Sequence, residues 1–258
     1  MSGQEANEIR RPIFNAVTSS RLLRIHTSGG WLLLLAWPAI SFGVIGLAYL
    51  TLGHRVFGKR VDGSMTFASM AILLPYLLCL WGVWYIIRLV SREPAYNTLV
   101  DGVLIGRRLH AAELPAGTQT VVDLTSEFPE PSALRSVSNY VAAPMLDASV
   151  LPPQTLADLA SKIAASETPL YIHCAQGHGR TGLVAALFLL ARGDADSPDT
   201  AIGDGKSSRP LVGLNGVQRA SLLAASKLLP SSASDRQHGF YAGVFCVPLF
   251  VYQASLGW

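Results

Sequence analysis

The first hundred residues contain two long runs of apolar side chains. Residues 31–52 include 22 consecutive positions without a charge, and residues 65–87 include 23. At a rise of 1.5 Å per residue, each run forms a helix of about 33 Å, enough to cross a hydrocarbon core of about 30 Å. Pro38 and Pro75 are compatible with spanning, because membrane helices tolerate proline in their interior. The pattern therefore predicts an N-terminal hairpin of two transmembrane helices.

After residue 95, short apolar runs alternate with amphipathic segments. Short apolar runs flanked by turn residues predict buried strands over residues 102–106, 120–124 and 170–174. Apolar side chains at helical spacing predict helices over residues 154–165, 181–192 and 215–229. Gly193 can end the second helix, and Asn215 can cap the third. Residues 96–230 are therefore expected to form an α/β domain, a sheet flanked by helices.

A further apolar segment follows the α/β domain, since residues 239–258 carry no charge. They are a third span, an interfacial segment or an apolar tail packed on the membrane helices. Pro248 and Gln253 make the segment a weaker span than the first two. The predicted organisation is an N-terminal segment (residues 1–30), the hairpin (31–90), the α/β domain (96–230) and the apolar tail (231–258).

Composition agrees with a chain that lies partly in lipid. The mean hydropathy of +0.35 is high, and only 14% of the residues are charged. The net charge of +3 is small, and the arginines cluster near the apolar runs and not in one basic stretch. This distribution excludes a nucleic-acid-binding face.

The basic residues also predict an orientation for the hairpin. Eight arginines flank the two apolar runs on their outer sides, namely Arg10, Arg11, Arg21, Arg24, Arg88, Arg92, Arg107 and Arg108. Three basic residues lie in the loop between the runs, namely Arg55, Lys59 and Arg60. The excess outside the loop predicts an integral membrane protein whose α/β domain faces the cytoplasm, at the inner membrane if the protein is bacterial.

The three cysteines do not form a metal or disulfide pattern. Cys79, Cys174 and Cys246 are odd in number and widely spaced, without a C-x-x-C pair or a neighbouring group of histidines. We therefore expect neither a disulfide scaffold nor a metal site. Cys79 and Cys246 lie in apolar runs and are expected to be inert.

Residues 171–182, YIHCAQGHGRTG, carry two overlapping signatures. Gly177, Gly179 and Gly182 spell G-x-G-x-x-G between a predicted strand and a predicted helix, as in a dinucleotide-binding turn. Such a fold needs a second strand that ends in an acidic residue about 20 positions later. The acidic residues that follow lie in residues 193–208, which are predicted to be a loop. An ATP-binding loop at GDGKSS is also excluded, because position 200 is threonine where that motif needs glycine.

The second signature is a phosphate-binding loop around a cysteine. A strand that ends at Cys174, a glycine-containing loop and a helix that begins near Arg180 direct backbone N–H groups and the positive helix end at one point. The same field favours the thiolate form of Cys174. Arg180 offers a planar fork that can bind two phosphoryl oxygens.

The segment HCAQGHGRTG resembles the His-Cys-x5-Arg-Ser/Thr signature of the protein tyrosine phosphatase superfamily. Its surroundings are similar to those of the dual-specificity branch: VVDLTSEF resembles the strand and turn before the acid loop, YVAAPMLD the acid loop, and RPLVGLNGVQ the stretch after the active-site helix. The resemblance covers residues 96–229 and implies a dual-specificity-phosphatase-like sheet flanked by helices. The hairpin lies outside it.

The resemblance implies a role for each matching residue. Cys174 would be the nucleophile, Arg180 the phosphate clamp, Thr181 the group that steadies the sulfur as leaving group, and His173 a residue that tunes it. Asp147 would be the general acid. Backbone N–H donors to the phosphate would come from Ala175, Gln176, Gly177, His178 and Gly179. No cofactor is implied.

Several neighbouring polar residues have alternative interpretations. Asp123 competes with Asp147 as general acid, but a brace for the turn after its strand fits it better. Glu127 is expected to be solvated. His178 faces either the substrate or solvent. Arg209 and Gln218 are expected to brace the domain and not to take part in catalysis.

These residues predict a membrane-anchored phosphatase that hydrolyses phosphate monoesters through a phosphocysteine. Protein phosphotyrosine or phosphoserine is the first choice of substrate, and a lipid phosphate of the phosphatidylglycerophosphate kind is the alternative. Neutral Ala175 and Gln176 make highly charged inositol headgroups less suitable. A phosphate-binding module without activity is a further alternative, which the presence of Cys174, Arg180, Thr181 and Asp147 disfavours.

Overall fold

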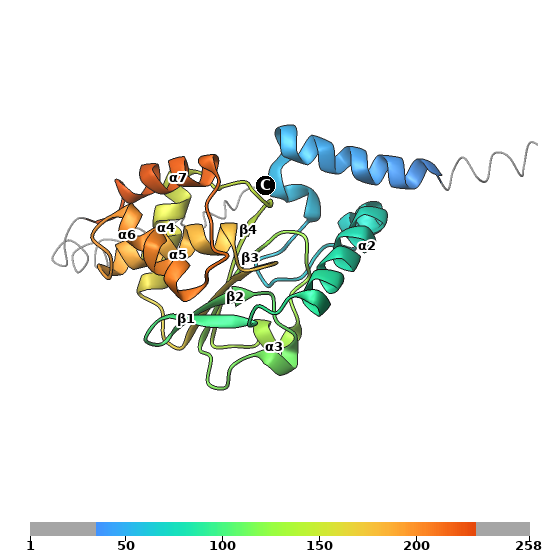
Figure 1. The fold of residues 1–258 in the computed structure, drawn as a ribbon. Coiled ribbons are helices and arrows are strands. Elements are labelled where there is room, and N and C mark those ends of the chain that lie inside the picture. The colour runs from blue at the N-terminus through green and yellow to red at the C-terminus, as the bar shows by residue number, and fades with distance from the viewer. Residues whose placement is uncertain (1–34, 231–258) are drawn as a thin grey trace, which may run out of the picture.

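The structure is a computed structural model that describes residues 35–230 (Figure 1). The expectations for the N-terminal segment, for residues 31–34 of the first apolar run and for the apolar tail with Cys246 lie outside the described residues. The described residues comprise a five-stranded sheet with helices on both sides, and a helical hairpin beside it.

The sheet has the strand order β1-β2-β5-β3-β4. Its strands are β1 (Tyr96–Val100), β2 (Val103–Arg107), β3 (Thr120–Thr125), β4 (Asn139–Met145) and β5 (Leu170–Cys174). β1 pairs with β2 in antiparallel fashion, and all other neighbours are parallel. Every residue of β3 and β5 is buried, which explains why most of their side chains are apolar.

Two edge strands were not predicted as strands. β4 contains most of the YVAAPMLD segment that the resemblance assigned to the acid loop, so only its end, from Leu146 onward, is a loop. From Val141 to Met145, β4 alternates between buried and partly exposed side chains. This alternation is typical of a strand with one buried face. β1 has little apolar character because it lies at the opposite edge, with one buried residue, Leu99.

Four helices cover one face of the sheet: α4 (Pro153–Ala164), α5 (Gly179–Arg192), α6 (Pro198–Ser208) and α7 (Gly216–Ser226) (Figure 1). α5 is almost entirely buried because it lies in the main apolar core with side chains of the sheet, α4, α6 and α7. Gly193 ends α5 at φ 81°, and the Asn215 side chain accepts a hydrogen bond from the Gln218 N–H at the start of α7. The predictions of these two helix boundaries are confirmed.

α6 corrects the prediction that residues 193–208 form a loop. Ser197 caps the helix by accepting the Thr200 N–H, and Pro198 occupies the first position, where no N–H is needed. Ala201 and Gly205 form the buried side of the helix. The glycines and serines of this segment have low helix propensity, so tertiary packing and the cap determine the helix.

The other face of the sheet carries the short helices η3 (Ala111–Glu113) and α3 (Ser132–Arg135), and the hairpin lies beside the sheet. The first hairpin helix runs from Leu35 to Phe57 and ends in a π turn, η1 (Ala48–Leu52), and a 3₁₀ turn, η2 (Gly53–Phe57). The second is α2 (Phe67–Val90). By length and composition, both helices could cross a membrane, which agrees with the two predicted apolar helices.

Proline in α2 is accommodated by the first helix. Pro75 lacks an N–H, so the carbonyl of Ala71, four residues earlier, has no donor within the helix. The indole N–H of Trp37 donates to this oxygen at 3.1 Å. The hairpin therefore supplies a donor for a backbone carbonyl that has none within its own helix.

The loop of the hairpin is bound to the α/β domain. Lys59 Nζ lies 2.6 Å from Asp123 Oδ2 and 3.1 Å from Thr125 Oγ1, and the side chains of Lys59 and Asp123 are 1% and 0% exposed. The Glu130 N–H donates to Gly63 O at 2.9 Å. This arrangement differs from the expected one, because a loop that joins two spanning helices would lie across the bilayer from the domain. The physical reason is the buried Asp123 carboxylate, which needs a cation.

Candidate active site

The predicted strand, loop and helix meet at Cys174. β5 ends at this residue, residues 175–178 form the loop, and α5 begins at Gly179. The Gly177 N–H donates to Cys174 Sγ at 3.2 Å. Gly177 has φ 76°, and a Cβ there would lie 2.3 Å from the Gly106 carbonyl carbon, so only glycine fits this turn. The loop therefore directs the Gly177 N–H at the sulfur.

Arg180 is buried beneath this loop and pairs with Glu127. Nη1 and Nη2 donate to Glu127 Oε2 and Oε1 at 3.0 and 2.7 Å, and Nη1 also donates to Met145 O at 2.9 Å. Nε has no hydrogen-bond partner among the described residues. Glu127 thus occupies one edge of the guanidinium, and the edge formed by Nε and Nη2 retains donors for a bidentate ligand.

Glu127 corrects the expectation of a solvated side chain. It is 5% exposed, and the Ser126 N–H and hydroxyl also donate to it. Burial alone raises the pKa of this carboxyl, but the charge and hydrogen bonds of Arg180 lower it below its ordinary value. Burial likewise opposes the charge of Arg180, yet Glu127 and Cys174 raise the pKa of the guanidinium. Glu127 and Arg180 therefore stay ionised together.

Asp147 and Asp123 lie in different places. Asp147 lines the same pocket as Cys174, its side chain is 77% exposed, and its Oδ1 lies 3.5 Å from Arg180 Nη2. The following residue, Ala148, has the left-handed φ of 57°, and the Asn215 side chain donates to its carbonyl at 2.9 Å. Asp123 is fully buried and accepts the Thr125 N–H and hydroxyl, so the prediction that it braces the turn after its strand is confirmed.

His173, the residue before Cys174, and Thr181, the residue after Arg180, are both fully buried. The His173 ring stacks on Tyr171 with 5.3 Å between ring centroids, and its pKa is lowered to about 4, chiefly by burial. The histidine is therefore neutral at pH 7. Within residues 35–230, Thr181 Oγ1 has no hydrogen-bond partner, so its expected contact with the sulfur remains a prediction.

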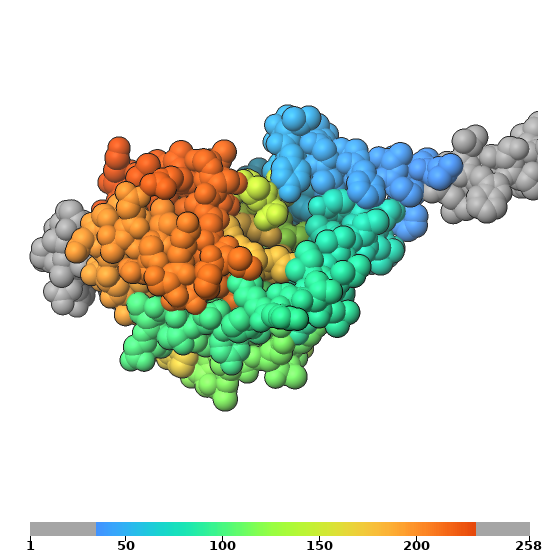
Figure 2. All heavy atoms as spheres, in the orientation of Figure 1, coloured from blue at the N-terminus to red at the C-terminus, as the bar shows by residue number. Residues whose placement is uncertain are grey.

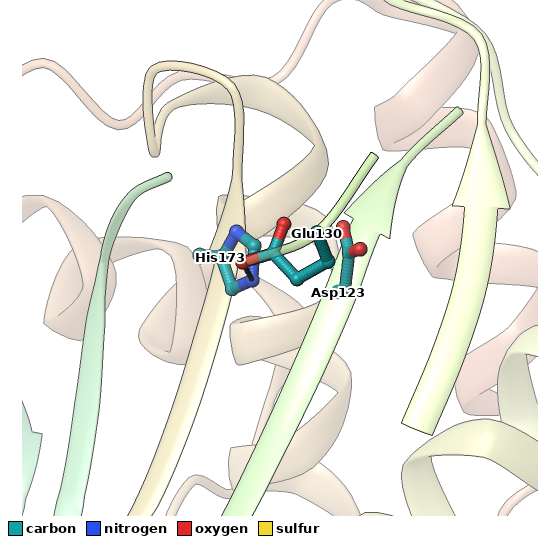
Figure 3. Close-up of side chains that lie close together, drawn as sticks. All are labelled: Asp123, Glu130 and His173. Atoms are coloured by element: carbon teal, nitrogen blue, oxygen red, sulfur yellow. Dashed lines mark ion pairs between the residues drawn. The ribbon is translucent and has the colours of Figure 1, made fainter. Parts of the chain in front are cut away.

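His173 also belongs to a buried group with Asp123 and Glu130 (Figure 3). One ligand atom from each residue lies within 4.8 Å of the other two, a spacing at which the three side chains could hold a metal ion. The surrounding cations are side chains: Lys59 contacts Asp123, and Arg108 Nε lies 3.3 Å from Glu130 Oε2. Burial and the charge of Asp123 raise the pKa of Glu130. The group is thus compensated by this chain's own charges, and we assign it a structural role.

A second buried arginine holds the loop from behind. Arg209 donates to Gly177 O and Gln176 O, each at 3.1 Å, and its Nη2 lies 2.8 Å from Glu93 Oε2. His178 Nε2 also lies 2.8 Å from Glu93 Oε2. The prediction that Arg209 braces the domain is confirmed by these bonds, and His178 is paired with Glu93 at the pocket.

The hairpin contributes one side of the site, which the sequence reasoning missed. Trp84 Nε1 donates to Ala175 O in the loop at 2.9 Å, and Trp81 Nε1 donates to Glu127 O at 3.0 Å. A pocket of about 440 Å³ lies between α2 and the start of α7, with Cys174 and Arg180 in its lining. Figure 2 shows the hollow between the teal α2 and the orange-red α7 region. The sequence signal that could have revealed this side of the site is the pair Trp81 and Trp84, three residues apart on α2.

Comparisons with known proteins locate a phosphatase domain in this chain. Residues 105–230 match the family model described as "Swiss Army Knife protein, DSP-PTPase phosphatase domain". A comparison with curated proteins found no match.

Similar solved structures include Tk-PTP in the active form, human DUSP28 and PTPMT1 in complex with PI(5)P. Tk-PTP is 21% identical, with 52% of this chain and 97% of that chain covered and a TM-score of 0.47. DUSP28 is 19% identical, with 53% and 95% covered and a TM-score of 0.44. PTPMT1 is 18% identical, with 53% and 97% covered and a TM-score of 0.46. Residues 105–230 of this chain are therefore a phosphatase domain of the dual-specificity type of the protein tyrosine phosphatase superfamily, which makes the chain a phosphatase of phosphoric monoesters.

Proposed function

We propose that Cys174 carries out the hydrolysis as a nucleophile, with Arg180 as phosphate clamp and Asp147 as general acid. The observation that supports this most strongly is that Cys174, Arg180 and Asp147 line one pocket, where Asp147 Oδ1 lies 3.5 Å from Arg180 Nη2 and Arg180 Nε has no partner among the described residues. A phosphoryl group above Cys174 would meet the loop N–H groups and this guanidinium edge. These donors match the negative oxygens of the group.

The proposed reaction has two steps. The Cys174 thiolate attacks phosphorus in line, the bond from phosphorus to the ester oxygen breaks, and Asp147 gives its proton to that oxygen. In the second step, Asp147 accepts a proton from water as the water attacks the phosphocysteine, which releases phosphate and restores the thiolate. Thr181 would stabilise the leaving sulfur, and neutral His173 would act through its position next to Cys174.

We further propose that the catalytic domain, residues 96–230, works at the cytoplasmic face of a membrane. Both helices of the hairpin expose apolar side chains, including Leu35, Leu50, Phe67 and Leu89. These faces are suited to insertion into one side of the bilayer, which is compatible with the bound loop. Phosphorylated proteins or lipids at this surface are the substrates.

The intermediate provides the direct test of this mechanism. Rapid denaturation of the full chain during turnover of p-nitrophenyl phosphate should trap a phosphate group on the peptide that contains Cys174. Mass spectrometry of the digested protein would locate it. Phosphate found on another residue, or steady turnover without any phosphorylated peptide, would contradict the proposed nucleophile.

The Asp147→Asn variant should distinguish substrates by their leaving groups. An alkyl phosphate needs a proton on its leaving oxygen, so its turnover should fall on the order of 10²-fold, the lower range for loss of general acid catalysis. Formation of phosphocysteine from p-nitrophenyl phosphate should fall much less, because p-nitrophenolate leaves without a proton. Stopped-flow measurement of the released p-nitrophenol isolates this step. Equal losses for both substrates would exclude Asp147 as the acid.

A further inference from the structure

One wall of the active-site pocket is built from the hairpin and not from the phosphatase domain. Tyr76, Leu80, Val83, Trp84 and Ile87 of α2 line the pocket together with Tyr49 and Phe57 of the first helix. The α2 positions are spaced four, three, one and three residues apart, which puts them on one face of the helix. A substrate whose phosphate reaches Cys174 therefore has this wall beside its leaving group.

The chemistry of the wall restricts what can lie on it. Phe57, Leu80, Val83 and Ile87 offer neither a donor nor an acceptor. A peptide laid against them would leave backbone N–H and C=O groups without partners, which costs free energy when water is excluded. A hydrocarbon chain has no such groups and gains from the contact. The wall thus favours an aliphatic leaving group.

The charges in the pocket point to a single phosphate. Among the described residues that line it, Arg180 is the only arginine or lysine, and Glu127 and Asp147 bring negative charge. Glu127 already engages one edge of the guanidinium, which leaves one bidentate edge. A headgroup with several phosphates would find no second cation there. The pocket is therefore matched to one phosphate monoester.

The apolar wall continues onto an exposed apolar surface. Val83 lines the pocket and is still 56% exposed. Leu89 and Val90 follow the pocket residue Ile87 at the end of α2 and are also exposed. A chain that leaves the pocket along α2 would therefore meet the surface of the hairpin that suits insertion into lipid.

We propose that the substrate is a phosphate monoester of a membrane lipid, with its phosphate at Cys174 and its acyl chains along the wall formed by Leu80, Val83 and Ile87. This assignment rests on the proposed function of Cys174. It makes the hairpin a part of the substrate site, because the lipid moves between the bilayer and the sulfur along a continuous apolar path. Asp147 lies at the pocket where the alcohol oxygen of the lipid would need its proton.

The test compares substrates that share the phosphate and differ in the chains. The full chain in one nonionic detergent is assayed with dihexanoyl phosphatidic acid below its critical micelle concentration, with glycerol 3-phosphate and with a phosphotyrosine peptide. Below its critical micelle concentration the lipid forms no micelles or vesicles of its own, and the same detergent is present with every substrate. We expect kcat/KM for the lipid to exceed that for glycerol 3-phosphate by about 100-fold. This ratio equals about 2.7 kcal/mol at 1.36 kcal/mol per factor of ten, the gain from burying three to four methylene groups.

Paired variants locate the contact. In the double variant Leu80→Ser/Val83→Ser, the ratio of kcat/KM for the lipid to that for glycerol 3-phosphate should fall at least about tenfold, because the wall loses its apolar side chains. The control Leu78→Ser/Ile86→Ser changes two exposed side chains of the same helix that do not line the pocket. It should change no kcat/KM value by more than about twofold, as is usual for surface substitutions. Circular dichroism establishes that both variants are folded.

The outcomes separate this inference from the proposed function. Similar kcat/KM values for the lipid and glycerol 3-phosphate, or a higher value for the phosphopeptide, would overturn the lipid assignment while Cys174-dependent hydrolysis persists. An unchanged lipid preference in Leu80→Ser/Val83→Ser would also overturn it. If the chain hydrolyses none of these substrates and no p-nitrophenyl phosphate, the proposed function itself fails.

Discussion

The Cys174→Ser variant should lose turnover of p-nitrophenyl phosphate by at least about 10⁴-fold, since loss of the nucleophile in covalent catalysis has effects of this size and larger. The reason is chemical, because a serine hydroxyl at this position stays protonated and is a poor nucleophile. The substitution replaces one atom, and the oxygen can still accept the Gly177 N–H that the sulfur accepts at 3.2 Å. The fold should be unchanged, and a phosphate analogue should still bind at Arg180.

Cys79→Ser is the matched control for this variant. The structure describes two free cysteines, and Cys79 is exposed on α2 and does not line the pocket. Its substitution should leave kcat and KM at the values of the unchanged chain. Activity that survives in Cys174→Ser, or that disappears in Cys79→Ser, would move the nucleophile away from the β5–α5 loop.

The second large effect is on stability, and it is expected for Lys59→Met. This variant keeps the length of the side chain and removes the ammonium that contacts the buried Asp123 at 2.6 Å. Loss of one partner of a buried ion pair costs about 3–5 kcal/mol of the free energy of unfolding, because the other charge remains buried. Thermal or denaturant unfolding of the phosphatase domain, followed in detergent, measures the effect.

Two further variants make this result specific to the bound loop. Arg60→Met changes the neighbouring basic residue, which is exposed, and should alter the free energy of unfolding by less than about 0.5 kcal/mol. Asp123→Asn in the Lys59→Met background should recover part of the loss, since the unpaired carboxylate is gone. Equal stability of Lys59→Met and Arg60→Met is the result expected for a loop on the far side of the bilayer, and it would contradict the contact described here.

The central part of the site could be predicted because its geometry is local in the sequence. The strand, the loop and the helix around Cys174 follow one another within about 20 residues, and each has its own signal in apolar periodicity, glycine or capping. Gly177 is a clear instance, because its left-handed φ and the contact with Gly106 leave no room for a side chain. The same reasoning yielded the boundaries at Gly193 and Asn215.

The partners that are distant in the chain could not be predicted. Glu127 lies 53 positions before Arg180, and nothing in its neighbourhood distinguishes a buried carboxylate from a solvated one. Lys59 has the appearance of a loop lysine until Asp123, 64 positions later, is seen to need a cation. Such pairs depend on how the elements pack, which a single sequence does not encode in its periodicity. Asp147 is an intermediate case. It is positioned locally, by the end of β4, but β4 was not recognised as a strand from the sequence.

Because Trp84 contacts the loop after Cys174, the part of the chain that shapes the site begins before the part that the family model matches. The family model begins at residue 105, whereas the indole that holds Ala175 and the Glu93 carboxylate that holds Arg209 and His178 lie before it. A chain cut at residue 96 keeps the whole phosphatase motif but lacks two of the groups that fix the catalytic loop. We therefore expect the smallest fully active fragment to begin within the hairpin, and a fragment that begins at residue 96 to be less active than the full chain.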